Sequence, residues 1–328
     1  MSVRPALGSS ARARARARRR FRKADRLGDM ALRGLCLVAS LLAMVAIVAI
    51  AYQVVHGARL SISHFGLRFL TSSAWKPNFN VFGATTLLYG TAVSSLMALA
   101  IATPISISIG LYLSMLAPRG VRGVVGPLVE MLAAIPSVIL GFWGILVLGP
   151  FLRSHVEPFL HNAFGFLPIF GAPSTSGSSV FTAGLILTIM VVPIIASVSR
   201  DLFATVPADL QDAAAALGAT RWEIVRGVVL PSTASGVAAA AFLGLGRALG
   251  EAIAVTQVIG AGSAIKPSLF ATGDTLASRI ANEFQGATSQ LHTASLFYLA
   301  VILLAIGLVT NLLAQWIGHR FDQRVLAQ

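Results

Sequence analysis

Charged residues are scarce in this sequence. They make up 11% of its 328 residues, whereas hydrophobic residues make up 56%. Soluble domains typically carry about 25% charged residues, so this composition argues against a soluble globular protein. Cysteine is nearly absent: the one copy, Cys36, lies in an apolar run, and a single cysteine excludes an internal disulfide. The sequence also contains no Walker A pattern, which excludes a P-loop for ATP in this chain.

Six long apolar runs account for the excess of hydrophobic residues. An α-helix needs about 20 predominantly apolar residues to cross the hydrocarbon core of a bilayer, and each run has about that length or more. The runs cover residues 35–55, 84–116, 124–148, 180–198, 232–259 and 293–317. They predict an all-α polytopic membrane protein with six transmembrane helices. We therefore expect a basic tail over residues 1–34, a spanning domain over 35–317 and a short tail over 318–328.

Basic residues are concentrated near the start of the chain. Residues 1–29 hold ten Lys or Arg and two Asp, and Ala11–Arg20 reads ARARARARRR. Only Phe21 adds an aromatic group there, so the pattern favours a disordered cytosolic tail that fixes topology and touches anionic lipid over a nucleic-acid site. The tail and first run also resemble a secretory signal, with a cleavage-like box at residues 49–51. The length of the run favours a retained anchor.

An even number of spans puts both termini on one side of the membrane. The short connections on that side carry several arginines, whereas the polar loops on the opposite side hold fewer basic residues in proportion to their length. Those opposite loops cover residues 56–83, 149–179 and 260–292. The positive-inside rule then places both termini, together with the stretch 201–231, in the cytoplasm.

The polar stretch between the fourth and fifth runs predicts two short helices with a bend. Pro207 marks a helix start, and residues 208–217 are mostly strong helix formers. Gly218 then stops that helix, because glycine adopts a left-handed backbone at little cost. Thr220 and Glu223 have the spacing of a capping box, which begins the second helix.

The same stretch resembles the EAA loop of ABC-importer permeases. The family pattern is Glu-Ala-Ala-x3-Gly-x9-Ile-x-Leu-Pro. The matching residues here are Asp212, Ala213, Ala214, Gly218, Val228, Leu230 and Pro231. The chain departs from the pattern by Asp212 for Glu and Val228 for Ile. The resemblance implies a cytoplasmic coupling loop over 201–231 that docks on a separate ATPase through residues 208–218, with Asp212, Ala213, Ala214, Gly218 and Glu223 as its candidate residues.

Arg247 and Glu251 lie inside the fifth apolar run. Charged residues within a span are costly to insert and usually serve a function. In a continuous helix, residues four apart share a face, so we expect the two side chains to meet. One interpretation is a self-neutralising pair that helps insertion. The other is that Arg247 faces an aqueous path and meets an anion, since its planar guanidinium can donate two parallel hydrogen bonds to an oxyanion.

Further segments resemble the C-type permease subunit of phosphate (Pst) ABC importers. They are residues 73–77, 82–84, 128–137 and 244–251, and with the EAA-like loop they spread the resemblance over about 72–256. The resemblance implies that Arg247 and Glu251 match charged positions implicated in phosphate passage, and that Glu130 matches another family position. The basic tail is not covered by it.

The resemblance also implies a fold, a location and partners. The fold is the ABC-importer (MetI-like) permease fold, in a bacterial cytoplasmic (inner) membrane. The partners are a homologous PstA-type permease, a PstB-type ATPase dimer that holds ATP-Mg, and an extracytoplasmic PstS-type phosphate-binding protein. The chain itself is then a transport subunit, and ATP hydrolysis belongs to the separate ATPase.

Other functions stay open on the residues alone. A permease for another oxyanion, such as sulfate or molybdate, would share these features, and a secondary transporter or channel would need no ATPase. A membrane enzyme is disfavoured, because no nucleophile, base and orienting group cluster in the spans. No metal site is predicted either, since His155 and His161 are six residues apart and do not share a helical face.

Overall fold

The computed structural model describes the backbone of residues 8–325 and the side chains of residues 28–317. Within that part of the chain the structure is mostly helical and has no β-strand, only an isolated bridge between Lys76 and Val81. Six helical stretches are long and apolar enough to cross a membrane: Gly28–Phe65, Thr85–Leu116, Ser137–Phe164, Val180–Ala204, Arg221–Gly250 and Gln290–Ile317. The prediction of an all-α protein with six spans is confirmed.

The first span belongs to α1 (Gly8–Phe65), a single helix of 58 residues. The chain divides into two compact units, and the boundary falls within this helix: the first unit ends at His56 and the second begins at Gly57. The helix begins at Gly8, where a disordered tail was expected, and residues 1–7 of that tail lie outside the described residues. Alanine, arginine and leucine are strong helix formers, and extending a helix costs far less than nucleating one. The helix therefore continues through the basic segment.

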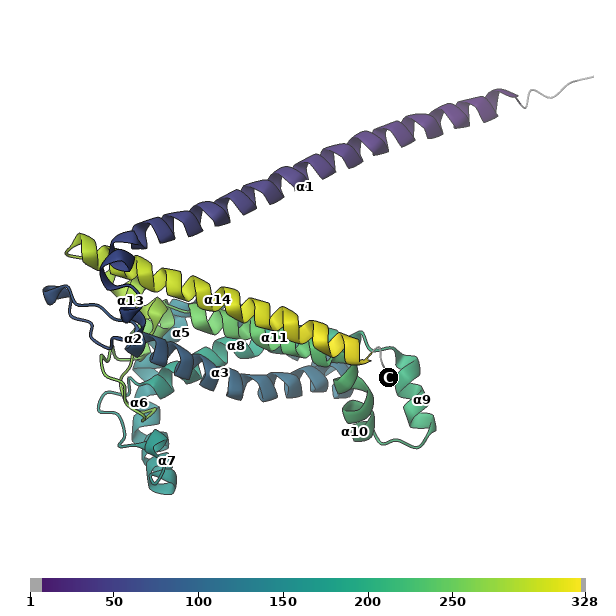
Figure 1. Ribbon diagram of the computed structural model, residues 1–328. Coiled ribbons are helices and arrows are strands. Elements are labelled where there is room, and N and C mark those ends of the chain that lie inside the picture. The colour runs from purple at the N-terminus through teal and green to yellow at the C-terminus, as the bar shows by residue number, and fades with distance from the viewer. Residues whose placement is uncertain (1–7, 326–328) are drawn as a thin grey trace, which may run out of the picture. The chain divides into compact units, whose positions relative to one another are not determined.

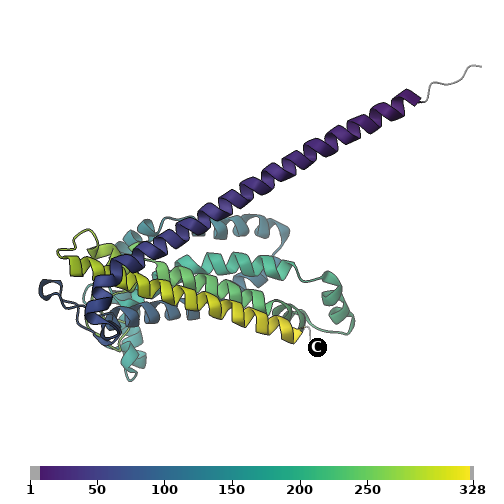
Figure 2. The same cartoon turned by 45° about the horizontal axis from the view of Figure 1, so that its top comes forward.

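Helix α8 (Val180–Ala204) lies at the centre of the second unit. It is the most buried of the six spans: 67% of an apolar window of 18 residues within it is buried inside the protein. Helices α3 (Thr85–Leu111) and α11 (Leu230–Gly250) pack against α8, and α14 (Gln290–Val325) packs against α11. Figures 1 and 2 show these helices running alongside one another. The second unit is therefore built around the fourth span.

Small residues allow α3 and α8 to approach closely. Gly184 of α8 faces Met97 of α3, and Gly110 of α3 lies against the backbone of α8 at Arg200. A side chain at Gly110 would meet that backbone nitrogen at 3.0 Å. Close backbone approach at small residues is the usual way for helices to associate within a bilayer, because lipid offers little hydrophobic driving force between them.

The third span differs from its predicted position. Residues 119–133 form a separate helix, α4 (Arg119–Ala133), and the span runs over Ser137–Phe164. The break falls just before Pro136, which disfavours a helical backbone at the preceding residue. The predicted loop over 149–179 is therefore helical as far as Phe164, and the predicted run over 124–148 combines parts of two helices. The high proline and glycine content of this segment suggested a loop.

Three of the prolines inside spans follow a π-helical segment by two residues and do not end the span. The segments are Gly144–Leu148, Leu152–Val156 and Val225–Val229, and the prolines are Pro150, Pro158 and Pro231. Proline has no backbone N–H and clashes with the carbonyl one turn earlier, and a wider turn relieves that clash. The predicted loop over 201–231 therefore does not end in a break at Pro231, because the helical stretch from Arg221 to Gly250 passes through this proline.

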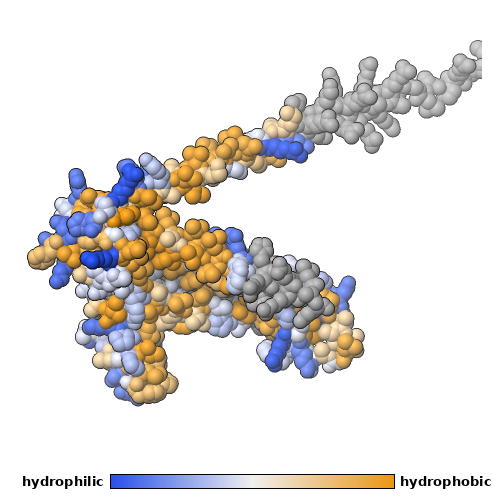
Figure 3. Space-filling model, in the orientation of Figure 1, coloured by the Kyte–Doolittle hydropathy of each residue, from blue (hydrophilic) through white to orange (hydrophobic). Residues whose placement is uncertain are grey.

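The remaining α-helices are short, and some of them are parts of spans. The third span contains α5 (Ser137–Trp143), α6 (Gly149–Phe151) and α7 (Glu157–Phe164), and the fifth span begins with α10 (Arg221–Ile224). Four others lie between the spans: α2 (Arg68–Thr71), α9 (Ala208–Ala216), α12 (Ile253–Val258) and α13 (Leu276–Glu283). Two 3-10 turns cover Pro77–Phe79 and Pro168–Phe170, and a further π segment covers Tyr112–Leu116. Figure 3 shows hydrophobic residues over the middle of the visible surface of this unit, with hydrophilic residues gathered toward the ends. That distribution suits a bilayer-spanning bundle.

Candidate functional site

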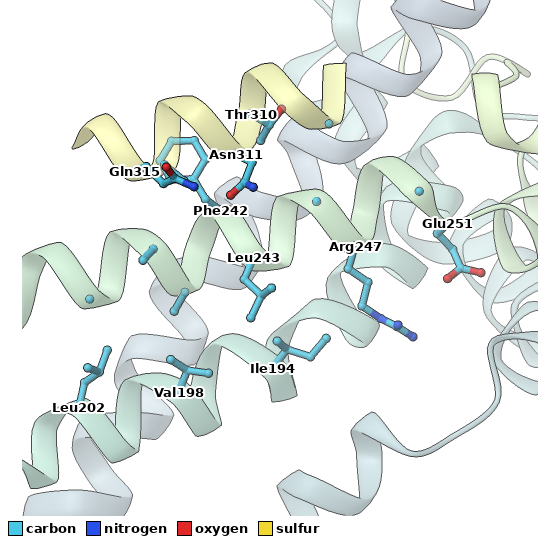
Figure 4. A pocket seen from close by; sticks show the side chains of 17 residues that line it. Ile194, Val198, Leu202, Phe242, Leu243, Arg247, Glu251, Thr310, Asn311 and Gln315 are labelled. Carbon is cyan, nitrogen blue, oxygen red and sulfur yellow. The ribbon is translucent and has the colours of Figure 1, made fainter. Parts of the chain in front are cut away.

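An open groove of about 1320 Å³ lies along α11. Helix α11 forms its floor, while α8 and α14 form its two walls, as Figure 4 shows. The wall on α8 is apolar and consists of Ile194, Val198 and Leu202. The wall on α14 consists of Gly307, Thr310, Asn311, Ala314 and Gln315. The groove thus combines an apolar wall with a polar one.

Arg247 lines this groove from the last turn of α11. Its side chain is exposed, and Figure 4 shows it extending away from the helix into open space. Among the described residues, no hydrogen bond or ion pair to its guanidinium is found. A cation at a helix C-terminus is favoured by the helix dipole, which helps to keep the group in place without a carboxylate. The guanidinium is therefore available to an anion that enters the groove.

Glu251 lies in the same groove but does not pair with Arg247. Helix α11 ends at Gly250, and Glu251 adopts an extended backbone with φ −71° and ψ 119°. Its carboxylate accepts a hydrogen bond from the backbone nitrogen of Ala254 at 3.3 Å, next to the start of α12. The expectation that the two charges share one helical face is wrong, because the helix stops between them. In the described part of the chain they form no ion pair.

Glu130 lies elsewhere. It belongs to α4, and its carboxylate forms an ion pair of 2.9 Å with Arg200 of α8. Arg200 also binds the neighbouring carboxylate of Asp201. Glu130 does not line the groove that holds Arg247. Arg247 and Glu251 therefore line the same groove without pairing, whereas Glu130 belongs to a separate contact between α4 and α8.

The EAA-like stretch forms the predicted pair of short helices. Pro207 is the N-cap of α9, and Gly218 has a left-handed backbone with φ +87°. The predicted capping box is present: the Glu223 nitrogen donates to Thr220 Oγ1, and Glu223 Oε2 accepts from the Thr220 nitrogen at 2.7 Å. Local sequence rules thus predicted the backbone of this loop.

The loop presents large apolar side chains to solvent. Leu217 is 90% exposed, Trp222 65% and Leu210 51%. Asp212 and Ala213 are also exposed, whereas Ala214 packs inward. Three large apolar side chains exposed on one short polar connection make it a candidate surface for another protein. Figure 1 shows α9 and α10 projecting at one end of the second unit, where such a surface is accessible.

A buried polar cluster at the opposite end was missed by the sequence analysis. Glu283 accepts hydrogen bonds from Trp75 Nε1 at 2.8 Å and from Arg279 at 2.6 Å, and it forms a 2.9 Å contact with His292 Nε2. Arg279 also pairs with Asp274 at 2.7 Å. The five residues come from positions 75 to 292, so no local spacing in the sequence links them.

The pKa values of the two carboxylates in this cluster, Asp274 and Glu283, are shifted in opposite directions by burial and hydrogen bonding. Burial raises the pKa of Asp274, although Arg279 opposes the shift. Burial acts the same way on Glu283, but hydrogen bonds from Arg279, Trp75 and His292 outweigh it, so the pKa of Glu283 is lowered. The cluster fixes the segment around Trp75 to α13 and to the start of α14.

A six-span bundle with an arginine-lined groove and an exposed apolar loop has the features of a membrane transport component. The family of binding-protein-dependent transport system inner membrane components matches residues 106–325 of this chain. The chain therefore belongs to that family.

Relatives with curated names agree with this family. The phosphate transport system permease protein PstC of Mesorhizobium japonicum is 39% identical over 327 residues, which cover 98% of each chain. PstC of Pasteurella multocida is 44% identical over 281 residues, covering 84% of this chain and 87% of the relative. The resemblance stated from motifs is thus confirmed over most of the chain.

Solved structures with the same fold include a bacterial alginate ABC transporter in complex with its alginate-bound periplasmic protein. The match has a TM-score of 0.58 at 20% identity and covers 87% of this chain and 96% of the other. A second alginate transporter structure matches with a TM-score of 0.56 at 19% identity, covering 89% and 99%. At such identities the likeness concerns the fold alone. It confirms the predicted ABC-importer (MetI-like) permease fold.

Proposed function

We propose that this chain is the permease subunit of an ATP-driven importer of inorganic phosphate and forms half of its translocation path. The names of the PstC relatives favour phosphate over sulfate or molybdate. The observation that carries the proposal is Arg247, a guanidinium without a protein partner among the described residues, inside a groove of a membrane-spanning bundle.

The charge of Arg247 is costly to place within a membrane-spanning bundle. An arginine at the centre of a bilayer costs about 2.5–3.5 kcal/mol on insertion scales, so an unpaired one needs an aqueous surrounding or a counter-ion. A phosphate ion offers the planar guanidinium two parallel hydrogen bonds, which no apolar substrate can do. Glu251, in the same groove, limits how tightly an anion is held, because its carboxylate repels the ion. Weak holding permits release toward the next site.

The exposed apolar loop supports coupling to a separate ATPase. Leu217 and Trp222 present apolar surface, and Asp212 and Ala213 of α9 are exposed as well. In the proposed assembly this loop docks on a PstB-type ATPase dimer, which binds and hydrolyses ATP-Mg. A PstA-type permease supplies the other half of the path, and a PstS-type binding protein delivers phosphate from outside.

The proposed cycle is alternating access. Closure of the ATPase dimer on ATP moves the docked loops, and the spans open outward. Phosphate enters from the binding protein, passes Arg247 and leaves inward after hydrolysis resets the bundle. Both termini and the docking loop are cytoplasmic in this proposal, because the basic residues are concentrated on that side.

Phosphate uptake by Arg247 variants tests the proposal. In cells lacking their own importer, Arg247→Gln is expected to reach the membrane at the wild-type level and to lose most radiolabelled phosphate uptake. Arg247→Lys is expected to be intermediate, since it keeps the charge but not the planar fork. The double variant Arg247→Gln, Glu251→Gln is the control for a purely structural role of the two opposite charges in the groove. Full uptake by the double variant would show that Arg247 does not serve phosphate.

A further inference from the structure

Two amide side chains in the last span line the same groove as Arg247. Asn311 and Gln315 are four residues apart on α14, so they lie one turn apart on one face of the helix. Figure 4 shows both on the α14 wall, with Gln315 toward the end of the groove near Leu202 and Arg247 toward the other end. The groove therefore carries polar groups near both ends.

These amides have no partner among the described residues. Both side chains are exposed, and no hydrogen bond to either is found there. The neighbouring Thr310 differs, because its hydroxyl donates to the carbonyl of Ile306 at 2.7 Å and is satisfied within the helix. The span that contains the amides has a mean hydropathy of 2.5 in its most apolar window. A polar group without a hydrogen-bond partner in such surroundings is costly, so the amides need a partner that the described residues of this unit do not supply.

The space between the two ends of the groove is open. A side chain added at Gly246 of α11 or at Gly307 of α14 would meet no atom within 4 Å. The opposite wall between these ends is apolar and includes Val198 and Ile194. An ion that moves away from Arg247 along the groove thus has enough space to pass. It loses its hydrogen bonds to the guanidinium, and the apolar wall offers none in return.

We propose that Asn311 and Gln315 form a second, uncharged station for the oxyanion, on the side of the groove nearer to the cytoplasmic loop. This inference rests on the proposed function, and it names the next contact after Arg247. The amide NH₂ groups can donate hydrogen bonds to phosphate oxygens without adding positive charge. A neutral station replaces part of the lost hydration while holding the ion weakly, and a path needs sites that release as well as bind.

The competing role for two such amides is hydrogen bonding to a helix of another subunit. The two roles differ in what phosphate does to the accessibility of the positions. A station in an aqueous path is reached by a small anionic reagent and is protected by phosphate. An amide that bonds to a neighbouring subunit is covered whether phosphate is present or not.

Cysteine labelling of the assembled importer separates these roles. The chain has one native cysteine, so Cys36→Ser gives a cysteine-free background for Asn311→Cys and Gln315→Cys. Leu312→Cys is the matched control, because Leu312 is exposed on the same helix turn but does not line the groove. The reagent is a sulfonate-bearing methanethiosulfonate, applied during ATP turnover in sodium phosphate or in sodium chloride of equal ionic strength.

We expect both groove cysteines to react, and phosphate to slow their reaction at least threefold, with no effect at position 312. A second measurement uses Asn311→Asp, which keeps the size of the side chain and adds a negative charge. Its uptake is expected to fall about tenfold, the effect of roughly 1.4 kcal/mol on a barrier, at an unchanged amount of assembled complex. Asn311→Ser keeps a hydrogen-bond donor and is expected to retain most uptake.

Failure of this inference is distinguishable from failure of the proposed function. Wild-type uptake that depends on Arg247, combined with unreactive or phosphate-insensitive cysteines at 311 and 315, overturns the second station alone. Loss of complex assembly in Asn311→Asp and Asn311→Leu alike assigns the amide to a subunit contact and also overturns the station. Phosphate uptake that does not depend on Arg247 overturns the proposed function, and the station with it.

Discussion

The indole nitrogen of Trp75 donates a hydrogen bond to Glu283 at 2.8 Å, although 208 positions separate the two residues. The same indole ring lies under the guanidinium of Arg279, with 5.6 Å from the guanidinium carbon to the ring centroid. One aromatic side chain thus contacts both members of the Arg279–Glu283 ion pair. This contact ties the segment before α3 to α13, and it stabilises the end of the second unit opposite the EAA-like loop.

Glu283 is predicted to make the stability of the protein depend on pH in acid. Its pKa is lowered from the ordinary value of 4.5, so its carboxylate stabilises the fold above that value and the contribution is lost as pH falls through the lowered pKa. Glu283→Gln should therefore lower the melting temperature of the purified complex at pH 7. The difference from wild type should shrink as pH is lowered below 4.5.

Trp75→Phe is the companion variant for this cluster. It keeps most of the ring packing and removes only the hydrogen bond to a charged acceptor, which is typically worth about 1.5–3 kcal/mol. Its melting temperature at pH 7 should lie between wild type and Glu283→Gln. A pH-independent difference between wild type and Glu283→Gln would contradict the assigned role of the carboxylate.

The sequence predicted local features well and long-range ones poorly. The capping box at Thr220 and Glu223 and the left-handed Gly218 follow from rules that span a few residues, and both are present. The Trp75–Glu283 contact depends on packing between distant segments, and no rule of spacing reports it.

Two predictions were wrong because they misjudged where proline and glycine end a helix. Pro150 and Pro158 suggested a loop, but π-helical turns before each proline keep the span helical. Conversely, the sequence predicted one continuous helix through Arg247 and Glu251. In the structure, helix α11 ends at Gly250, so the two charged residues do not share a helical face. Whether a proline or glycine breaks a helix depends on tertiary packing, which a single sequence does not show. The position of Arg247 in a groove was nevertheless consistent with the cost of a charge in a span.

Gly218→Val tests the docking loop through its backbone. A left-handed backbone costs a residue with a Cβ roughly 1–2 kcal/mol, and a β-branched one is among the least tolerant. A side chain at Gly218 would meet nothing within 4 Å, so the effect is conformational rather than steric. We expect normal membrane insertion with reduced ATPase binding and reduced phosphate uptake. Gly227→Ala is the control, since Gly227 also has open space but no positive φ. Wild-type coupling in Gly218→Val would remove the support for docking through this turn.

Glu130→Gln tests whether the contact between α4 and α8 takes part in phosphate passage. The Glu130 side chain is 53% exposed, and an exposed ion pair contributes about 0–1 kcal/mol, so the melting temperature should change little. Arg200 keeps Asp201 as a partner in this variant. We expect uptake to fall less than in Arg247→Gln, because Glu130 lies outside the groove. A loss as severe as that of Arg247→Gln would place Glu130 on the path of the ion.

The orientation of the spans is the last prediction, and the single native cysteine makes it accessible to labelling. In the Cys36→Ser background, cysteines at Ser176 and Thr272 should react with a membrane-impermeant thiol reagent added to intact cells. Both residues are exposed: Ser176 lies in the connection between α7 and α8, and Thr272 lies in the connection between α12 and α13. Figure 1 shows α7 and α13 away from the end that carries α9 and α10.

Ala219→Cys is the matched position at the other end, between α9 and α10. It should react only after permeabilisation, because the excess of arginine in the neighbouring connections favours the cytoplasmic side. The same orientation places the loop with Leu217 and Trp222 where a cytoplasmic ATPase could reach it. Labelling of Ala219→Cys in intact cells, with Ser176→Cys protected, would invert the topology. It would also exclude docking on a cytoplasmic ATPase, since the exposed apolar loop would then lie on the wrong side of the membrane.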